Sequence, residues 1–317
     1  MDESLNYVKK LKGQHYRFFG KHEHSAAKLC LWTKKSMRNR GFCYKQAFYG
    51  VESHRCLQMS PNVYCQLRCV FCWRTWEHEP LNYLPKVWDE PKELVDESIL
   101  AQRKLISGLG GVADVDRKKW KEAQEPSQIA ISLDGEPTMY PYLGDLIKEY
   151  HKRKATTFLV SNGLLPKRLE ALEPLPTQLY ISLYGPDKQT HQKTNLPLTN
   201  DSWEKLNESL ALFPSLDTRK VIRLTLVKGV NMIKPEEYAK LISLSEAQYL
   251  EIKGFMFVGG SRQRLTIENM PRHDEIRAFA EKVGAGCGYK IANEQPISRV
   301  VLLVRPDLEG KNTLINK

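Results

Sequence analysis

The sequence has no hydrophobic run long enough to cross a membrane and too few cysteines for a disulfide framework. A membrane-spanning helix needs about 20 consecutive apolar residues, and no stretch of the 317 residues approaches this. The N-terminus, MDESLN, lacks the apolar core of a secretory signal peptide. The seven cysteines are an odd number, unlike the paired sets of small secreted proteins. We therefore expect a cytoplasmic protein without a membrane partner, in which clustered cysteines indicate metal binding.

The composition is that of a globular protein with an uneven charge distribution. Hydrophobic residues make up 41% and charged residues 27% of the chain, enough for a sizeable core in one large domain or two small ones. The net charge is +11, of which +8 lies in residues 1–60. Such a basic region favours a nucleic-acid partner, because Lys and Arg displace counterions from phosphates. A solubilising surface is the equal alternative.

A short stretch of the chain holds Cys65, Cys69 and Cys72 in the spacing C-x3-C-x2-C, with Phe71 before the last cysteine. Three thiolates can hold three irons of a cubane cluster and leave the fourth iron open for a ligand. A zinc knuckle and three buried thiols are the alternatives. Zinc usually closes four ligands, and His78 is the nearest candidate for a fourth. In this spacing the chain resembles the radical S-adenosylmethionine (SAM) superfamily.

A second set of cysteines precedes the first: Cys30, Cys43 and Cys56, in the spacing C-x12-C-x12-C. Isolated thiols are more often small buried hydrophobic residues. Two features favour metal binding instead. Cys56 lies nine residues before Cys65, and the set again has three members, so a cluster built on it would again leave one iron open.

Lys45 follows Cys43 by two residues, in the segment FCYKQAFY. A lysine held near a metal and aromatic groups can have a lowered pKa and form a Schiff base with a carbonyl compound. The plain alternative is that Lys45 is one more residue of the basic surface.

Apolar runs of strand length alternate with helical stretches from Pro91 onward. Continuous apolar strands separated by helices predict a parallel sheet with both faces covered. With one strand before the cysteine loop, the fold class is α/β, an incomplete (β/α)6 TIM-like barrel. The predicted strands are 129–133, 156–160, 178–183, 221–227, 249–255 and 299–304. The predicted helices are 2–30, 91–108, 142–153, 166–173, 201–213, 235–245 and 273–284.

Small and polar residues mark the ends of these strands. The chemistry of such barrels lies at the carboxyl ends of the strands, where glycine admits a ligand close to the backbone and polar side chains converge on it. Each residue alone is ordinary turn chemistry, but the succession after the cysteine loop indicates a site. In chain order the residues are Ser132, Asp134, Gly135, Glu136, Ser161, Asn162, Gly163, Ser182, Arg223, Thr225, Glu251 and Lys253.

Together these motifs resemble those of the archaeal-type tRNA 4-demethylwyosine synthases of wybutosine biosynthesis, a radical SAM family, over nearly the whole chain. The resemblance implies SAM and two [4Fe–4S] clusters. Cys65, Cys69 and Cys72 would hold the SAM cluster, and the three earlier cysteines an auxiliary cluster. It further implies a radical SAM partial barrel with a C-terminal extension in residues 59–317. A basic, mainly helical extension carrying the auxiliary-cluster cysteines would occupy residues 1–58.

The resemblance also assigns individual side chains. The superfamily motif G-G-E-P appears here as DGEP, so Gly135 and Glu136 are expected to bind the methionine amino group of SAM. Asp134 replaces the first glycine, which leaves open how closely the backbone approaches SAM. Lys45 matches the lysine proposed in the family to engage pyruvate. The other expected SAM-binding residues are Phe71, Asn162, Ser182 and Thr225.

The implied reaction condenses N1-methylguanosine, next to the anticodon of tRNA-Phe, with pyruvate to form 4-demethylwyosine. A 5′-deoxyadenosyl radical takes a hydrogen from the N1-methyl group, the carbon radical adds to C2 of pyruvate, C1 is lost and the ring closes. The enzyme would be a carbon–carbon lyase. Pyruvate could be held by the auxiliary cluster, by a Schiff base with Lys45 or by both. We expect a monomer that takes electrons from a flavodoxin- or ferredoxin-like protein, since no flavodoxin-like unit precedes the cysteines.

RNA is usually bound through unstacked loop bases held by aromatic and basic side chains. The seventh cysteine, Cys287, is expected to have no role. One alternative function is another two-cluster radical SAM enzyme acting on RNA, such as a sulfur-inserting one. The other is a zinc-stabilised RNA-binding protein. The candidate tRNA contacts are Arg17, Lys34, Lys35, Arg38, Arg40, Trp73, Arg74, Trp76, Arg262, Arg264 and Arg272.

Overall fold

A ten-stranded sheet organises the computed structural model, which describes residues 3–80 and 84–315. The strand order is β1-β2-β3-β4-β5-β6-β7-β8-β10-β9, and the sheet is open. The neighbours from β3 to β8 are all parallel. These parallel strands are β3 (Cys56–Ser60), β4 (Gln128–Ile131), β5 (Thr156–Ser161), β6 (Gln178–Ser182), β7 (Arg219–Leu226) and β8 (Tyr249–Gly254).

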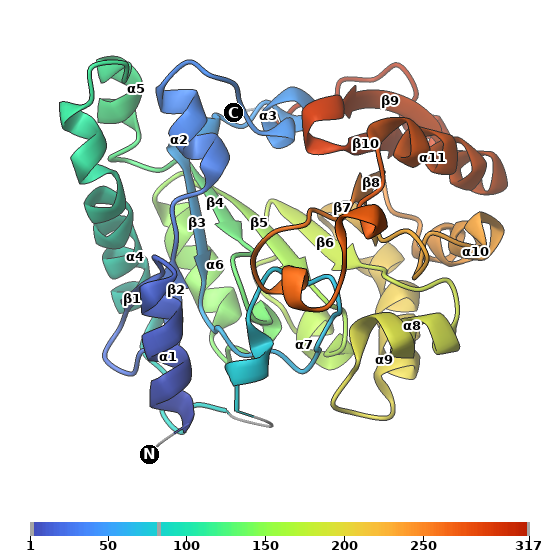
Figure 1. Cartoon of the computed structure of the whole chain (residues 1–317), viewed down its shortest axis with the longest axis horizontal. Helices are drawn as coiled ribbons and strands as arrows, with labels where there is room; N and C mark the ends of the chain where they lie inside the picture. The colour runs from blue at the N-terminus through green and yellow to red at the C-terminus, as the bar shows by residue number, and fades with distance from the viewer. Residues whose placement is uncertain (1–2, 81–83, 316–317) are drawn as a thin grey trace.

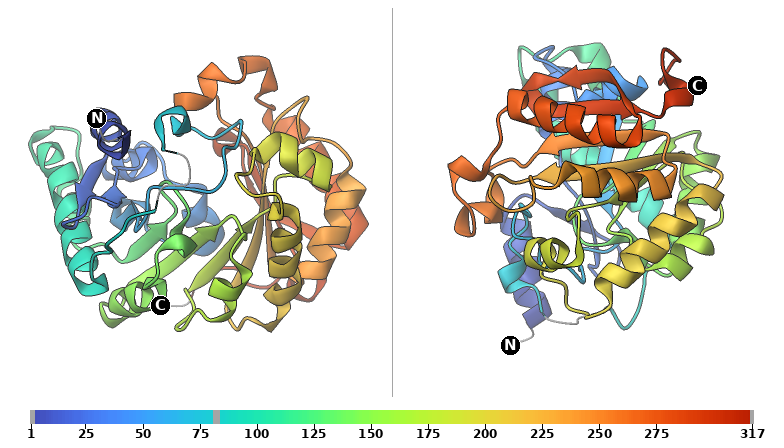
Figure 2. Two further views of the ribbon diagram at one scale, coloured as in Figure 1. Left: turned by 90° about the horizontal axis from the view of Figure 1, so that it is seen from below. Right: turned by 90° about the vertical axis from the view of Figure 1, so that its right-hand side faces the viewer.

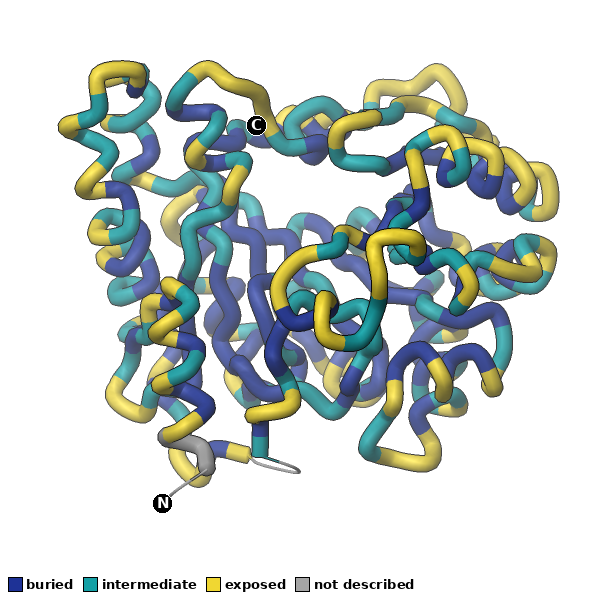
Figure 3. Tube along the Cα trace, viewed as in Figure 1, coloured by how far each residue is buried: buried dark blue, intermediate teal, exposed yellow. Residues whose placement is uncertain are grey.

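The central strands are apolar because they are buried on both faces, as Figure 3 shows for the middle of the sheet. Every residue of β4 and β6 is buried. The predicted strands of this region are therefore confirmed to within one or two residues at each end. The parallel pairing brings the carboxyl ends of β3 to β8 to one edge of the sheet.

Helices cover the outer side of the curved sheet (Figures 1 and 2). Proline occupies the first turn of three of them, where its missing N–H costs nothing. The predicted helices of this layer are confirmed, with ends shifted by up to three residues. They are α4 (Pro91–Ile106), α6 (Leu143–Lys152), α7 (Pro166–Glu170), α9 (Ser202–Leu212), α10 (Pro235–Ser245) and α11 (His273–Cys287). The short helices α5 (Arg117–Glu122) and α8 (Lys188–Asn195) were not predicted. No helix in the described part of the chain is long and apolar enough to cross a membrane.

The prediction of one helix over residues 2–30 was wrong beyond residue 13, and residue 2 lies outside the described residues. Helix α1 (Glu3–Gly13) ends at a glycine and is followed by two short antiparallel strands, β1 (Arg17–Phe19) and β2 (Ser25–Ala27). Strand β2 then pairs with β3. The edge of β3 needs a hydrogen-bonding partner, and this tertiary requirement overrides the helical spacing of apolar residues.

The N-terminal region consequently contains strands as well as helices. It contributes the two strands above and two further short helices, α2 (Leu31–Met37) and α3 (Tyr44–Tyr49). Strand β3 runs across residue 58 into the parallel sheet, so the N-terminal region and the barrel share one sheet.

The last predicted strand exists, as β10 (Val300–Val304), but it is not part of the parallel series. It pairs antiparallel with β8 and with β9 (Lys290–Gln295), which was not predicted. The connection from β9 to β10 is too short for a parallel crossover. Strand β9 was missed because its residues are largely exposed and polar.

Candidate active site

A cavity of about 290 Å³ opens where the parallel strands end. Its lining contains all three cysteines of the C-x3-C-x2-C loop, which follows β3. The ends of β4 to β8 and the segments that follow them contribute the rest. The structure thus brings together the nine residues that the sequence predicted for the first cluster and SAM: Phe71, Cys65, Cys69, Cys72, Gly135, Glu136, Asn162, Ser182 and Thr225.

The three thiols of this loop lie in a protein environment that keeps them neutral in the absence of metal. Burial raises the pKa of Cys65 to about 12, although the charge of Arg74 opposes this. Burial, and then the charges of Cys72 and Cys65, raises the pKa of Cys69. A bound metal deprotonates a coordinating thiol outright. Forming bare thiolates in this loop is therefore costly. Iron bound to the three thiolates would stabilise them.

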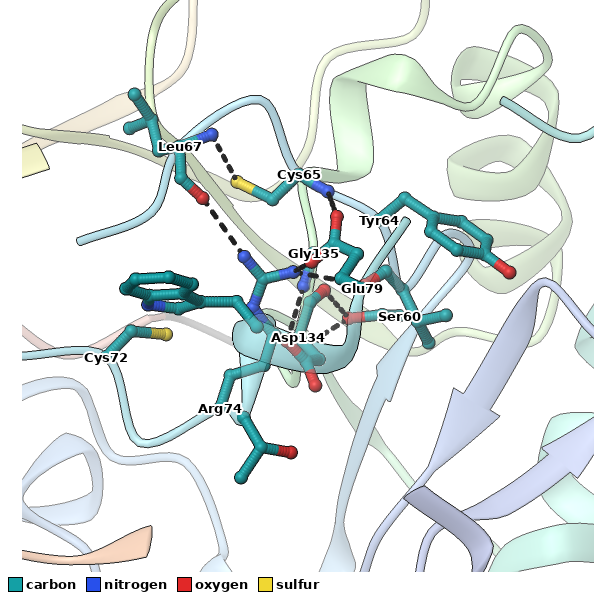
Figure 4. Close-up of polar contacts among 12 residues, drawn as sticks. Ser60, Tyr64, Cys65, Leu67, Cys72, Arg74, Glu79, Asp134 and Gly135 are labelled. Carbon is teal, nitrogen blue, oxygen red and sulfur yellow. Dashed lines mark hydrogen bonds and ion pairs between the residues drawn. The ribbon is translucent and has the colours of Figure 1, made fainter. Parts of the chain in front are cut away.

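A buried ionic cluster fixes this loop to the end of β4 (Figure 4). The guanidinium of Arg74 contacts the carboxylate of Glu79, and its Nε lies 3.1 Å from Oδ1 of Asp134. The other oxygen of Glu79 accepts a hydrogen bond from the backbone N–H of Cys65 at 2.8 Å. Asp134 also accepts a hydrogen bond from the hydroxyl of Tyr16 at 2.9 Å. The aspartate that replaces the first glycine of the G-G-E-P motif therefore anchors the cysteine loop.

The next two residues of the motif are constrained by the backbone of the same loop. Gly135 has a φ of +65°, and a Cβ there would lie 2.2 Å from the carbonyl oxygen of Asn62, so only glycine fits. The carboxylate of Glu136 accepts hydrogen bonds from the backbone N–H of Asn162 at 2.8 Å and from the hydroxyl of Thr138 at 2.6 Å. Glu136 thus holds the ends of β4 and β5 together, and burial raises its pKa.

The segment between β8 and α11 clamps the cysteine loop from the other side; it is the orange segment beside the loop in Figure 1. Arg264 donates hydrogen bonds to the carbonyl of Val70 at 2.9 Å and to that of Cys72. A Cβ on Gly259 would lie 2.2 Å from the carbonyl oxygen of Trp73. Gly259 and Gly260 follow β8 along the chain, and their lack of side chains admits this contact. Arg74 and Arg264 were predicted to contact tRNA, but both side chains form their hydrogen bonds with other residues of the protein. Arg74 is only 2% exposed.

None of the three cysteines of the second set lines the cavity. Cys30 and Cys43 are the N-cap residues of α2 and α3, and Cys56 begins β3. Burial raises the pKa of Cys43 to about 11, with Cys30 as the next cause. Burial, then the charge of Cys30, raises the pKa of Cys56, and Cys43 contributes. Three thiols 13 residues apart in sequence therefore act on one another electrostatically.

Lys45 lies in the first turn of α3 and is buried, with 8% of its surface exposed. It is therefore not part of the basic surface. Its ammonium lies 4.9 Å from the ring centroid of Phe158 and 5.1 Å from that of Tyr180. Burial, and then the charge of Arg223, lowers the pKa of Lys45. A buried amine of lowered pKa is the form that attacks a carbonyl carbon.

A group of charged and phenolic side chains lies between Lys45 and the cavity. Glu251 on β8 accepts hydrogen bonds from the hydroxyls of Tyr44 at 3.0 Å and Tyr49 at 2.9 Å. Arg223 on β7 donates from Nε to Glu251 at 3.0 Å, and it also lines the cavity. Lys253 lines the cavity two residues after Glu251. This group connects the two cysteine sets through one face of β7 and β8.

Each of the two sets supplies three cysteine thiols, the donor type that holds iron–sulfur clusters. Within residues 3–80 and 84–315, no three Cys, His, Asp or Glu side chains are gathered closely enough to hold one metal ion. A zinc site requires four such ligands around one ion. A cubane cluster takes one thiolate on each of three irons, so its thiolates stand further apart.

Comparisons with known proteins agree with this chemistry. The profile described as radical SAM superfamily matches residues 59–242, and the one described as wyosine base formation matches residues 244–305. A protein of Pyrococcus abyssi named S-adenosyl-L-methionine-dependent tRNA 4-demethylwyosine synthase is 50% identical, over 99% of this chain and 92% of its own length. One of the same name from Methanocaldococcus jannaschii is 41% identical over 96% of both chains.

Two solved structures share the fold over nearly the whole chain. One, described as TYW1 with a lysine–pyruvate adduct bound, has a TM-score of 0.88 at 38% identity and covers 98% of both chains. The other, described as archaeal TYW1, has a TM-score of 0.80 at 35% identity, covering 98% of this chain and 99% of that one.

Proposed function

Because the chain belongs to the tRNA 4-demethylwyosine synthases of the radical SAM superfamily, we propose that it condenses N1-methylguanosine next to the anticodon of tRNA-Phe with pyruvate. The product would be the tricyclic base 4-demethylwyosine, and the enzyme class a carbon–carbon lyase. The observation that carries the choice of pyruvate is the burial of Lys45 beside Cys43 and Cys56. The related protein described with a lysine–pyruvate adduct supports the same choice.

We assign two [4Fe–4S] clusters to the two cysteine sets. Cys65, Cys69 and Cys72 would hold the cluster that binds SAM, and the second set of Cys30, Cys43 and Cys56 would hold the auxiliary cluster. When reduced, the first cluster and SAM supply a 5′-deoxyadenosyl radical. We further assign residues 59–317 to a (β/α)6 partial barrel with a C-terminal extension and residues 1–58 to an N-terminal extension that carries the auxiliary site.

The protein's own groups would orient the reactants and keep water out. Gly135 allows the backbone to approach SAM, and Glu136 presents a carboxylate that its hydrogen bonds hold in place. The remaining proposed SAM contacts in the cavity wall are Phe71, Asn162, Ser182 and Thr225.

Lys45 would attack C2 of pyruvate as the neutral amine. The new C=N bond replaces the carbonyl, and one water leaves. The surrounding rings of Phe158 and Tyr180 shield this carbon from bulk water. Such covalent attachment fixes the position of C2 before the methyl-derived carbon of the tRNA reaches it.

The proposed partners are tRNA-Phe and an external flavodoxin- or ferredoxin-like electron donor, for a cytoplasmic monomer. Two candidate contacts among those predicted for tRNA remain at the rim of the site. Trp73 lines the cavity and stacks on Tyr16 with ring centroids 6.0 Å apart. Arg262 lies on the exposed side of the clamping segment.

The deciding experiment is turnover of N1-methylguanosine-containing tRNA-Phe with reductant and SAM, with and without pyruvate, followed by mass spectrometry of the digested tRNA. We expect 4-demethylwyosine only when pyruvate is present. A modified base formed without pyruvate would overturn the proposal in favour of another radical SAM reaction on RNA, such as sulfur insertion. Iron and zinc analysis of the same sample tests the cofactors, with about eight irons per chain expected for two cubane clusters.

A further inference from the structure

On the basis of the proposed function, we propose that Lys253 binds the carboxylate of the keto acid held at Lys45. Lys253 would then determine that the second substrate is an α-keto acid and not a neutral carbonyl compound.

Lys253 lies at the end of β8, where the strand faces the cavity. It is half-buried and lines the cavity beside Thr225, its partner in the parallel register of β7 and β8. Its ammonium lies 5.8 Å from the ring centroid of Tyr44, the residue before Lys45. Lys253 therefore lines the cavity and also approaches the segment that carries Lys45.

The neighbouring carboxylate is already occupied. The carboxylate of Glu251 accepts a hydrogen bond from Nε of Arg223 at 3.0 Å and further hydrogen bonds from the hydroxyls of Tyr44 and Tyr49. Among the described residues, Lys253 has no hydrogen-bond or ion-pair partner. Glu251 is thus already engaged by Arg223, and Lys253 has no carboxylate of its own among the described residues.

An unpaired cation in a confined site costs free energy unless an anion balances it. A carboxylate is the anion that an α-keto acid supplies, on the carbon next to its carbonyl. A charge-assisted hydrogen bond from the ammonium to that carboxylate would be strong in such a site. Attachment of the carbonyl carbon to Lys45 would leave the carboxylate free to face Lys253.

The methionine part of SAM carries a second carboxylate that could enter the same cavity. We assign Lys253 to the keto acid because its aromatic neighbour is Tyr44, beside Lys45. The end of β4, with Gly135 and Glu136, lies instead against the cysteine loop. The binding of SAM is therefore measured beside the trapping of pyruvate.

The test is reductive trapping with borohydride, which converts an imine at Lys45 into a stable amine that mass spectrometry detects. Pyruvate is compared with methyl pyruvate, which keeps the ketone but has no carboxylate. We expect the wild-type protein to trap pyruvate at least tenfold more efficiently than methyl pyruvate at equal low concentration. Lys253→Met should abolish this preference by weakening pyruvate trapping alone, and Lys253→Arg should retain most of it.

A matched control is Lys220→Met on β7, whose ammonium donates to the carbonyl of Pro214 at 2.9 Å and does not line the cavity. It should leave the preference unchanged. Iron content and the circular dichroism spectrum establish that each variant is folded.

The outcomes separate the two proposals. If wild-type protein traps no pyruvate at Lys45, the proposed role of Lys45 fails and the assignment of Lys253 fails with it. If wild-type protein prefers pyruvate and the folded Lys253→Met variant keeps that preference, only the assignment of Lys253 is overturned. A raised Kd for SAM with unchanged pyruvate trapping would overturn it in favour of the methionine carboxylate.

Discussion

Arg74 and Asp134 form a buried ion pair, with Nε of the arginine 3.1 Å from Oδ1 of the aspartate, that joins the cysteine loop to the end of β4. Both side chains are almost fully inaccessible to solvent. Removing one partner of a buried pair leaves the other charge without compensation, which is more costly than the pair itself is stabilising.

The first prediction concerns Asp134→Gly, which restores the glycine of the superfamily motif. We expect it to lower the free energy of unfolding by about 3 kcal/mol, because Arg74 then keeps only Glu79 as a charged partner. Urea unfolding of the reconstituted protein measures this. Asp134→Asn preserves the shape of the side chain and should cost less, since the amide oxygen still accepts hydrogen bonds. Equal stability of Asp134→Gly and wild type would show that the ion pair does not hold the loop.

The second prediction concerns the clamp on the other side of the loop. Arg264→Ala removes the donors to the carbonyls of Val70 and Cys72 and the cation over the Trp76 ring, 4.7 Å from its centroid. We expect a less ordered loop, with at least a fivefold loss of SAM affinity. The auxiliary cluster should keep its electron paramagnetic resonance signal. Binding of SAM is measured by isothermal titration.

The control for that experiment is Arg262→Ala, on the exposed side of the same segment. Its Nε donates to the carbonyl of Phe257 at 3.1 Å, outside the cysteine loop. This variant should bind SAM normally and weaken only tRNA binding. The same loss of SAM affinity in both variants would argue for a general disturbance of the segment.

The third prediction is a pH dependence of imine formation. The pKa of Lys45 is lowered from 10.5, first by burial and then by Arg223. The reactive form is the neutral amine, so the rate of trapping with pyruvate should rise with pH. It should level off once the pH exceeds the lowered pKa. We expect the midpoint of this rise to lie below 10.5; a midpoint at or above that value would contradict a buried, desolvated amine.

The fourth prediction concerns stability at acid pH. Burial lowers the pKa of His191 from 6.5 to about 4. The neutral ring packs beside Asn195, with Nδ1 2.9 Å from the side-chain amide nitrogen of that residue, and Asn195 lies 3.5 Å from the sulfur of Cys69. The unfolded chain takes up the proton at higher pH than the folded one. Stability from this group is therefore complete above pH 6.5 and is lost as the pH falls from 6.5 to 4.

The loss should reach about 3 kcal/mol near pH 4, because each pKa unit corresponds to about 1.4 kcal/mol. Urea unfolding across this pH range measures it. His191→Gln cannot take up a proton, so the part of the pH dependence due to this group should disappear. An unchanged pH profile in the variant would show that other groups govern acid unfolding.

The fifth prediction separates the two cysteine sets. Cys43→Ala should lower the iron content from about eight to about four per chain. It should leave SAM binding largely intact and abolish formation of the tricyclic base. Cys69→Ala is the matched variant in the other set and should abolish SAM cleavage itself. Equal loss of SAM cleavage and base formation in Cys43→Ala, with the first cluster intact, would argue against separate roles.

Much of the site could be predicted from sequence because its parts lie at the ends of parallel strands. Gly135, Asn162, Ser182 and Thr225 follow apolar runs, and parallel pairing alone places such strand ends at one edge. The polar segments were less predictable. Strand β9 has no apolar pattern, and β1 and β2 form only because β3 offers them a free edge.

Three features could be predicted from the sequence alone: the spacing of the cysteine loop, the alternation of buried strands and helices, and the residues that end each strand. These features depend on neighbours along the chain, where spacing translates directly into local geometry. The burial of Lys45 and the pairing of Asp134 with Arg74 could not be predicted from the sequence and became visible only in the folded chain. The same holds for Lys253, which lines the cavity and has no hydrogen-bond or ion-pair partner among the described residues. Each of these depends on contacts between distant segments, which strand order and packing bring together.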